Sequence, residues 1–281
     1  MSNFSKVNII LSRKNGVVEL SSIAPKNKKS QKQTSDIKAS RTDPAIKTIA
    51  RTLMENFDVG KDVMLTLTLS EEALGQMKTA VQGSEAAEDA LLKKLNKEMR
   101  KYIRRVRDNQ KDPKYVCVPS DRERDSKGEM VPARPHIHLI IQKEHVESAK
   151  QKWTLGETNK TTLYDKNGDF YLLAKYLIEQ TRPISGRKRY MVSRNMSKPY
   201  ELSVLVPMDV ARQLRVPDGC TELYTSDSFL CGVKQSRYRA SFNQASKNEY
   251  QQTLFEKLAE ALPPQLLDYI EKLSGGADAD L

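Results

Sequence analysis

Two of the chain's three histidines, His136 and His138, stand one residue apart in segment 134–141, which reads Arg-Pro-His-Ile-His-Leu-Ile-Ile. Its apolar, partly β-branched composition is typical of a buried strand. Residues i and i+2 of a strand project to the same side, so the two imidazoles share one face of the sheet. Each ring can then give one nitrogen to a single cation. The alternative is that water solvates both histidines and no metal binds. Because the chain has only three histidines, the placement of two of them in one short segment favours a metal site.

The residues around the pair argue against two kinds of site. A binuclear hydrolase needs further histidines and aspartates close downstream, where only His145 follows. A two-histidine phosphoesterase needs two separate His-x-Thr/Ser motifs, and this chain has one histidine cluster. A mononuclear site, completed by one more polar ligand, is what remains.

The string Pro-His-Ile-His-Leu at 135–139 resembles the His-hydrophobe-His motif of the HUH endonuclease superfamily. It is most similar there to rolling-circle replication initiators of small single-stranded-DNA phages and plasmids. Three more segments resemble family motifs in the family's order: the strand 64–68, the tyrosine–lysine segment 170–176 and the basic segment 190–195. The resemblance covers roughly residues 60–200.

The resemblance implies an α+β fold, with a central, mostly antiparallel sheet and helices packed on it. It also implies an enzyme whose tyrosine attacks a DNA phosphodiester, forms a 5′-phosphotyrosine and releases a 3′-hydroxyl that primes synthesis. The expected cofactor is Mg²⁺ or Mn²⁺, and the expected substrate is single-stranded or hairpin origin DNA. Alternatives are a transposase or relaxase of the same superfamily, or a nonenzymatic nucleic-acid-binding regulator that keeps the fold.

Two tyrosines, Tyr171 and Tyr176, are candidates for the nucleophile. Tyr171 and Lys175 lie one turn apart on the predicted helix 169–180, where an ammonium group stabilises a phenolate. We therefore predict Tyr171 as the nucleophile and Lys175 as its electrostatic partner. Tyr176 is the alternative, because Ala-Lys-Tyr matches relatives whose tyrosine directly follows the lysine. Its spacing predicts that it belongs to the apolar stripe of the helix, together with Leu172, Leu173 and Leu177.

The third metal ligand is expected on the strand that pairs with the histidine strand. If the hairpin turns at its Lys-Gly pair, Asp121 and Glu123 share the required strand parity. We predict Asp121, with Glu123 next and Glu129 as a third candidate. Relatives often place a glutamate directly after Val-Pro, where this chain has Ser120.

Basic residues around one aromatic ring follow the tyrosine helix. Cations that follow phosphates beside a ring on which bases stack are typical of single-strand binding. A solvated basic hairpin is the alternative. The predicted DNA-binding residues are Arg182, Arg187, Lys188, Arg189, Tyr190 and Arg194.

The elements that position these residues follow from periodicity. Alternation predicts a strand at 63–69, and apolar residues at three- and four-residue spacing predict a helix at 85–108 with a basic outer face. That basic face is either solvated or in contact with DNA. A hairpin over 114–141 and a helix at 146–153 come next. We predict a largely disordered basic arm at 1–44 with one short strand near 7–11, and an HUH core at 45–200. A C-terminal extension at 201–274 with helices at 249–262 and 265–273 follows, and then a frayed tail at 275–281.

The composition indicates a polyanionic partner. The chain carries 47 Lys+Arg against 36 Asp+Glu, a net charge of +11. Without a span of apolar residues or a signal-peptide core, we expect no membrane contact and a location in the cytoplasm of a bacterial host. No phosphate-binding loop of an ATP-driven motor occurs. Unwinding and synthesis are therefore expected to come from a host helicase and polymerase.

Overall fold

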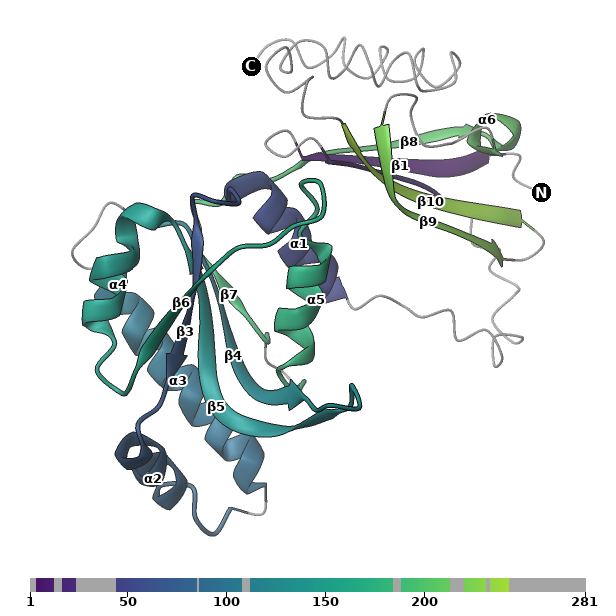
Figure 1. Ribbon diagram of the computed structural model, residues 1–281. Coiled ribbons are helices and arrows are strands. Elements are labelled where there is room, and N and C mark those ends of the chain that lie inside the picture. Colours follow the sequence, from purple (N-terminus) through teal and green to yellow (C-terminus); the bar gives the residue numbers. More distant parts are fainter. Residues whose placement is uncertain are drawn as a thin grey trace. The chain divides into compact units, whose positions relative to one another are not determined.

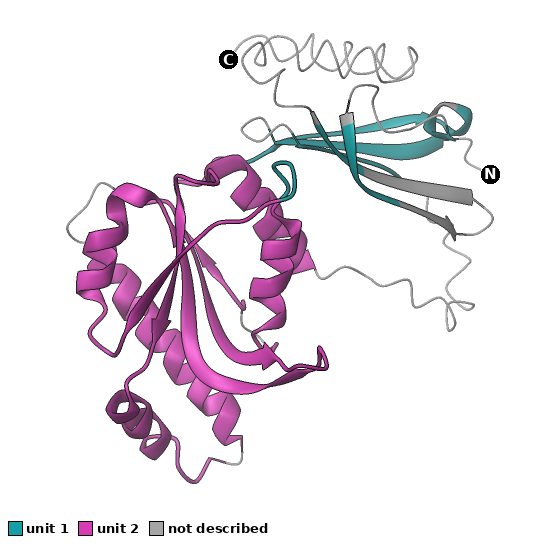
Figure 2. Cartoon of the chain, in the orientation of Figure 1, with its two compact units in different colours: residues 1–41, 166–169, 198–281 teal, residues 42–165, 170–197 magenta. Residues whose placement is uncertain are grey.

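The computed structural model describes residues 4–12, 17–23, 44–84, 86–107, 112–183, 188–212, 220–230 and 233–242. These residues form two compact units, shown in Figure 2. Unit 2 comprises residues 42–165 and 170–197, and unit 1 comprises 1–41, 166–169 and 198–281. The histidine pair belongs to unit 2.

Unit 2 is built on a five-stranded sheet in which all neighbours are antiparallel. The strand order is β6-β3-β5-β4-β7, so the histidine strand β5 is central. The strands are β3 (Val63–Thr68), β4 (Tyr115–Arg124), β5 (Met130–Ile141), β6 (Thr158–Thr162) and β7 (Met191–Val192).

Helices cover both faces of this sheet (Figure 1). One face carries the odd-numbered residues of β3 and β5, and α2 (Glu71–Thr79), α3 (Ala87–Arg107) and α4 (Val146–Lys152) pack on it. The other face carries His136 and His138, and α1 (Pro44–Asn56) and α5 (Tyr171–Glu179) pack there. The histidines were expected on one face with helices on the opposite face and the tyrosine helix above them. The helix α1 is an addition to that expectation.

The strong 3.6-residue period of α3 explains its place in the core. Its buried stripe comprises Leu92, Leu95, Met99, Tyr102, Ile103 and Val106. The hydroxyl of Tyr102 donates a hydrogen bond to the Ala149 carbonyl at 2.9 Å, which ties α3 to α4. The helix begins two residues later and ends one residue earlier than predicted.

Unit 1 is a second antiparallel sheet with the order β8-β1-β2-β10-β9. It contains β1 (Phe4–Ser12), β2 (Val17–Ile23), β8 (Tyr200–Pro207), β9 (Cys220–Leu230) and β10 (Val233–Phe242), with the short helix α6 (Met208–Arg212). The short strand expected near 7–11 is confirmed and extends over 4–12, whereas the disorder predicted for 17–23 is wrong. Apolar side chains such as Val7, Leu11 and Val18 are fully buried there. The predicted C-terminal helices and tail lie outside the described residues.

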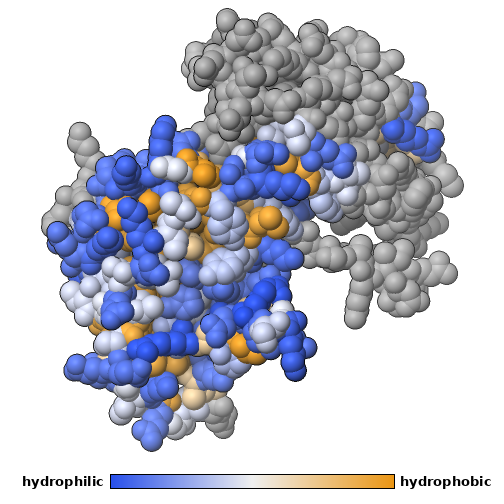
Figure 3. Space-filling model, viewed as in Figure 1, coloured by the Kyte–Doolittle hydropathy of each residue, from blue (hydrophilic) through white to orange (hydrophobic). Residues whose placement is uncertain are grey.

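The α+β class with antiparallel sheets is confirmed. Three elements of unit 2, α1, α2 and β6, were not predicted. The surface of unit 2 seen in Figure 3 is largely hydrophilic with small apolar patches. Across the described ranges, no helix combines the length and apolarity needed to cross a bilayer.

Candidate active site

His136 and His138 point at each other from the central strand. Their Nε2 atoms are 3.0 Å apart and their ring centroids 4.7 Å apart. This is the arrangement that strand parity predicts for residues i and i+2. His138 is buried, with 2% of its surface exposed, whereas His136 is half-buried. One ring therefore opens toward solvent and the other is held in the protein.

Gln180 supplies a third donor atom that sequence reasoning missed. Its Oε1 lies 2.9 Å from His138 Nε2. Gln180 follows the last residue of α5 and is itself buried. Two backbone N–H groups, those of Asp121 and Arg122, donate to its carbonyl at 3.0 and 3.1 Å. The register of β4 shifts between Ser120 and Arg122, and this bulge frees both N–H groups for the helix end.

The two separations measured from His138 Nε2 are compatible with ligands of one divalent cation. Ligands at about 2.1 Å in neighbouring positions of an octahedron lie about 3.0 Å from each other. The separations from His138 Nε2 to its two partners, 3.0 and 2.9 Å, match that value. Imidazole nitrogen and amide oxygen suit Mn²⁺ and, with more water in the shell, Mg²⁺. His136, His138 and Gln180 are therefore the residues that would hold the ion.

Both rings have partners that orient them. His136 Nδ1 is 2.9 Å from the Arg134 carbonyl, which can only accept, so Nδ1 carries the proton and Nε2 keeps its lone pair. His138 Nδ1 lies 3.4 Å from the hydroxyl oxygen of Thr66, its register partner on β3. Such outer contacts are typical of histidine metal ligands, because they fix the tautomer and the ring orientation.

Burial keeps His138 neutral. Its pKa falls from 6.5 to about 4, chiefly because the buried ring loses water, and further because His136 is close, while the hydrogen bond with Gln180 acts in the opposite direction. A neutral imidazole donates a lone pair to a cation, and Nε2 offers it when the single proton is on Nδ1, where the Thr66 hydroxyl oxygen can accept it.

Tyr176 lies against the histidine pair. Its ring centroid is 5.5 Å from that of His138, and 38% of its surface is exposed. The buried face of α5 consists of Leu173, Ala174, Leu177 and Ile178, while Leu172 is 56% exposed. The prediction that Leu172 and Tyr176 belong to the buried stripe is therefore wrong, because both side chains are exposed, although the Tyr176 ring also contacts His138.

The structure places the two other helix candidates elsewhere. Tyr171 precedes Tyr176 by five residues, which is about 140° around a helix, so it points in a different direction from the ring beside His138. The ammonium group of Lys175 pairs with Glu179 at 3.8 Å, and Glu179 also accepts from Arg124 at 2.6 Å. The geometry thus favours Tyr176 over Tyr171 as the group nearest the histidines.

Tyr164, which the sequence did not single out, is close to Tyr176. Its side chain is 45% exposed, and its pKa is raised by burial and then by Tyr176. Of these two partly exposed phenol rings, Tyr176 is the one in contact with His138. No sequence motif marks Tyr164, because it lies in the loop after β6.

The predicted carboxylate ligands have other roles. Asp121 is buried and its two oxygens accept from Arg182, at 2.6 Å from Nε and 3.3 Å from the backbone N–H. Glu123 is exposed near the hairpin tip, where its register partner is Val131. Neither carboxylate is the register partner of a histidine, because the bulge in β4 leaves Ser120 opposite His136. The hydroxyl of Ser120 is buried and has no hydrogen-bond partner within the described residues.

The predicted DNA-binding residues are not one cluster. Arg182 is mostly buried and also pairs with Glu88 at 2.5 Å, so its charge holds the loop after α5 to β4 and α3. Arg189 is half-buried, and a guanidinium N–H donates to the Ile178 carbonyl at 3.5 Å. Arg187 lies outside the described residues. Lys188 and Arg194 are exposed and Tyr190 is half-buried.

No family model, curated protein or solved structure matches this chain. Within the described ranges, no group of three His, Cys, Asp or Glu residues is placed to hold a metal ion. This agrees with the geometry, because the third donor beside the two histidines is an amide.

Proposed function

We propose that this protein is a metal-dependent HUH-type endonuclease that nicks and rejoins single-stranded DNA, and thereby initiates rolling-circle replication. One observation carries the proposal: His138 contacts His136, Gln180 and the ring of Tyr176 at once. A cation site and a phenol beside it are what transfer of a DNA strand to tyrosine needs.

In this proposal Tyr176 is the nucleophile. Its phenolic oxygen forms a bond to phosphorus as the bond from phosphorus to O3′ breaks, which leaves a 5′-phosphotyrosine. The electron pair of the broken bond goes to O3′, and the proton lost by the phenol is balanced by the one that the new 3′-hydroxyl gains. Attack by a 3′-hydroxyl on the phosphotyrosine reverses the step and rejoins the strand.

The other residues of the site would hold the metal ion and orient the histidine rings. His136, His138 and Gln180 would hold Mg²⁺ or Mn²⁺, which polarises the phosphate as a Lewis acid when bound. Arg134 holds His136 through its carbonyl, and Thr66 faces the second ring. The partly exposed rings of Tyr164 and Tyr176 offer surfaces on which unpaired bases can stack.

Trapping of the covalent intermediate tests the proposal. The full chain is incubated with single-stranded oligonucleotides from hairpin-rich origin sequences and Mn²⁺, and protein–DNA adducts are separated on a denaturing gel. We expect Tyr176→Phe to abolish the adduct, and His136→Ala or Gln180→Ala to lower it at least about tenfold, the loss typical of a missing ligand or orienting group. The matched control, Tyr171→Phe, keeps it. An adduct that survives Tyr176→Phe but is lost in Tyr171→Phe would reverse the assignment, and binding without any adduct would favour a nonenzymatic regulator.

A further inference from the structure

A stripe of five cations runs along α3, on the sheet face opposite the histidines. The residues follow one another at intervals of four, three, four and three, which places them on one side of the helix. All five are exposed. This basic stripe consists of Lys93, Lys97, Arg100, Arg104 and Arg107.

We propose that the basic stripe binds the phosphate backbone of duplex DNA. The inference concerns a surface separate from the histidine site and does not depend on nuclease activity.

The first argument is the charge of the stripe. Glu98 forms an ion pair with Lys101 at 2.8 Å, and Asp112 forms one with Arg107 at 3.2 Å. Within the described part of the chain, no carboxylate pairs with the four other stripe residues. These four charges are consequently available to an anionic partner.

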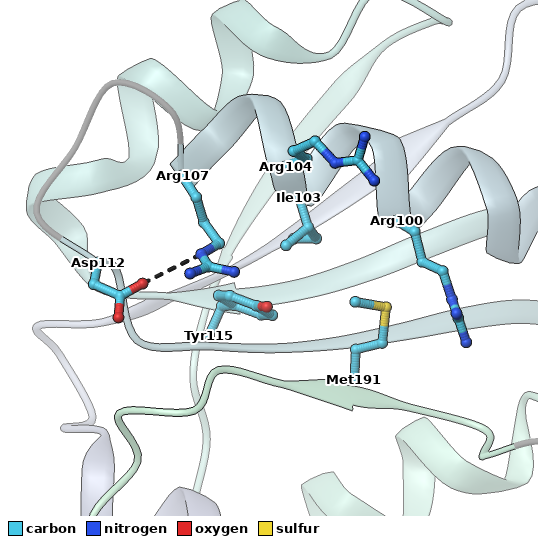
Figure 4. Close-up of a pocket in the computed structure, with 7 residues that line it drawn as sticks. All are labelled: Arg100, Ile103, Arg104, Arg107, Asp112, Tyr115 and Met191. Carbon is cyan, nitrogen blue, oxygen red and sulfur yellow. Dashed lines mark hydrogen bonds and ion pairs between the residues drawn. The ribbon is translucent and has the colours of Figure 1, made fainter.

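The second argument is a shallow hollow at the C-terminal half of the stripe (Figure 4). Its volume is about 460 Å³. Arg100 and Arg107 extend from α3 on either side of Met191 and Tyr115, and Ile103 lies between them. Asp112 also lines the hollow and pairs with Arg107 at 3.2 Å, so a phosphate at this rim would meet chiefly Arg100 and Arg104, whose guanidinium groups come from neighbouring helical turns.

The third argument concerns the kind of anion. The stripe spans fifteen residues, 93–107, and the fourteen steps between its ends cover about 21 Å of straight helix. It has no exposed aromatic ring on which unpaired bases could stack, because Tyr115 and Tyr102 are buried. An anionic membrane is a poorer match, since the apolar side of α3 is packed in the core and cannot insert into lipid. A rigid duplex with regularly spaced phosphates fits a straight row of cations.

The experiment measures binding of a fluorescent 30-base-pair duplex to the full chain at several salt concentrations by fluorescence anisotropy. In the test variant, Lys97→Glu, Arg100→Glu and Arg104→Glu are combined. In the matched control, three exposed lysines of unit 2 outside the stripe are changed in the same way: Lys127→Glu, Lys143→Glu and Lys160→Glu. Circular dichroism verifies that both variants keep the wild-type fold.

We expect the stripe variant to bind duplex at least about tenfold more weakly at moderate salt. The slope of log Kd against log salt should fall by about 2.7, because each lost phosphate contact contributes about 0.9. Binding to a thirty-residue oligothymidine should change much less, and the control should stay within about twofold of wild type.

Several outcomes would overturn the inference. These are wild-type protein that does not bind duplex, a stripe variant that keeps its duplex affinity, and a control that loses as much. Equal losses for duplex and oligothymidine, or stronger binding to phosphatidylserine vesicles than to duplex, would also overturn it. The adduct assay on a short single strand is expected to be unchanged in the stripe variant, so failure here is separate from failure of the proposed nuclease.

Discussion

The ring of His138 must stay neutral if its nitrogen is to bind a cation. Because its pKa is about 4, the ring makes the free energy of unfolding depend on pH. Because this value lies below the ordinary 6.5, the unfolded chain takes up the proton first as the pH falls. The stability contributed by the neutral ring is therefore complete above about pH 6.5 and is lost as the pH falls toward 4.

The expected loss from this one histidine is about 2 kcal/mol between pH 7.5 and 5.0. Urea unfolding of the full chain in EDTA, at both values, measures it. His138→Gln should flatten the dependence by that amount, whereas His145→Gln, which also removes one histidine, should retain it. Equal pH dependence in the wild type and His138→Gln would contradict the low pKa.

The identity of the third ligand is also a question about single residues. A ligand at a hundredfold excess over its Kd adds about 2.7 kcal/mol to stability, so Mn²⁺ should raise the melting temperature of the wild type. Gln180→Ala and His136→Ala should lose most of this rise. Asp121→Asn and Glu123→Gln should keep it, each measured against its own metal-free melting temperature. A rise that disappears in Asp121→Asn but persists in Gln180→Ala would restore the carboxylate predicted from the sequence.

These residues show where sequence reasoning succeeds and where it fails. The shared face of His136 and His138 follows from strand parity, which is local. Gln180 could not be found in this way, because it reaches the histidines from a helix end through contacts with a bulge 60 residues away in the chain. Tyr176 was ranked below Tyr171 because a row of leucines suggested a buried stripe, and only packing shows that Leu172 faces outward.

At the scale of elements, the bulge of β4 connects the sheet to the end of α5. Two N–H groups of the bulge donate to the Gln180 carbonyl. The Asp121 carboxylate accepts from Arg182, which follows Gln180 by two residues. Breaking a buried ion pair by removing one charge typically costs about 3–5 kcal/mol. This contact therefore holds the loop that follows the tyrosine helix.

We predict that Asp121→Asn lowers the free energy of unfolding by about 3 kcal/mol, because it leaves the largely buried Arg182 with less compensation. Glu123→Gln, on the same strand but exposed, should change it by no more than about 0.5 kcal/mol. Chemical denaturation of both variants measures the difference. Equal effects would mean that the ion pair of Asp121 does not hold this region.

Element prediction from the sequence succeeded for segments with a clear period, namely β3, the hairpin of β4 and β5, α3, α4 and α5. It failed for β2, and for β1 it predicted only the short stretch near 7–11. Their partners are β8, about 190–200 residues later, and β10, about 220 residues later, and the polar, basic stretch that follows β2 suggested disorder. Pairing between distant segments is invisible to local patterns.

For the whole molecule, unit 1 depends on strands from both ends of the described chain. Val7 is fully buried in β1, whereas its neighbour Lys6 is exposed. Val7→Asp should unfold this sheet, because it buries a charge without a partner. Limited proteolysis with mass spectrometry should then show new cleavage at 200–242, and Lys6→Asp should resemble the wild type. Protection that persists in Val7→Asp would mean that the strand pairing of β1 is not needed for unit 1.

Because β1 and β2 pair with strands that come much later in the chain, their sheet can be completed only late in synthesis. Both strands are made before the histidine-bearing unit, yet β10 is complete only at residue 242. At about 5–20 residues per second, the ribosome leaves the early hairpin without its later neighbours for about 10–40 s. During that wait the entire histidine-bearing unit is synthesised. Strands β1 and β2 thus reach their final neighbours only after the whole of the histidine-bearing unit has been made.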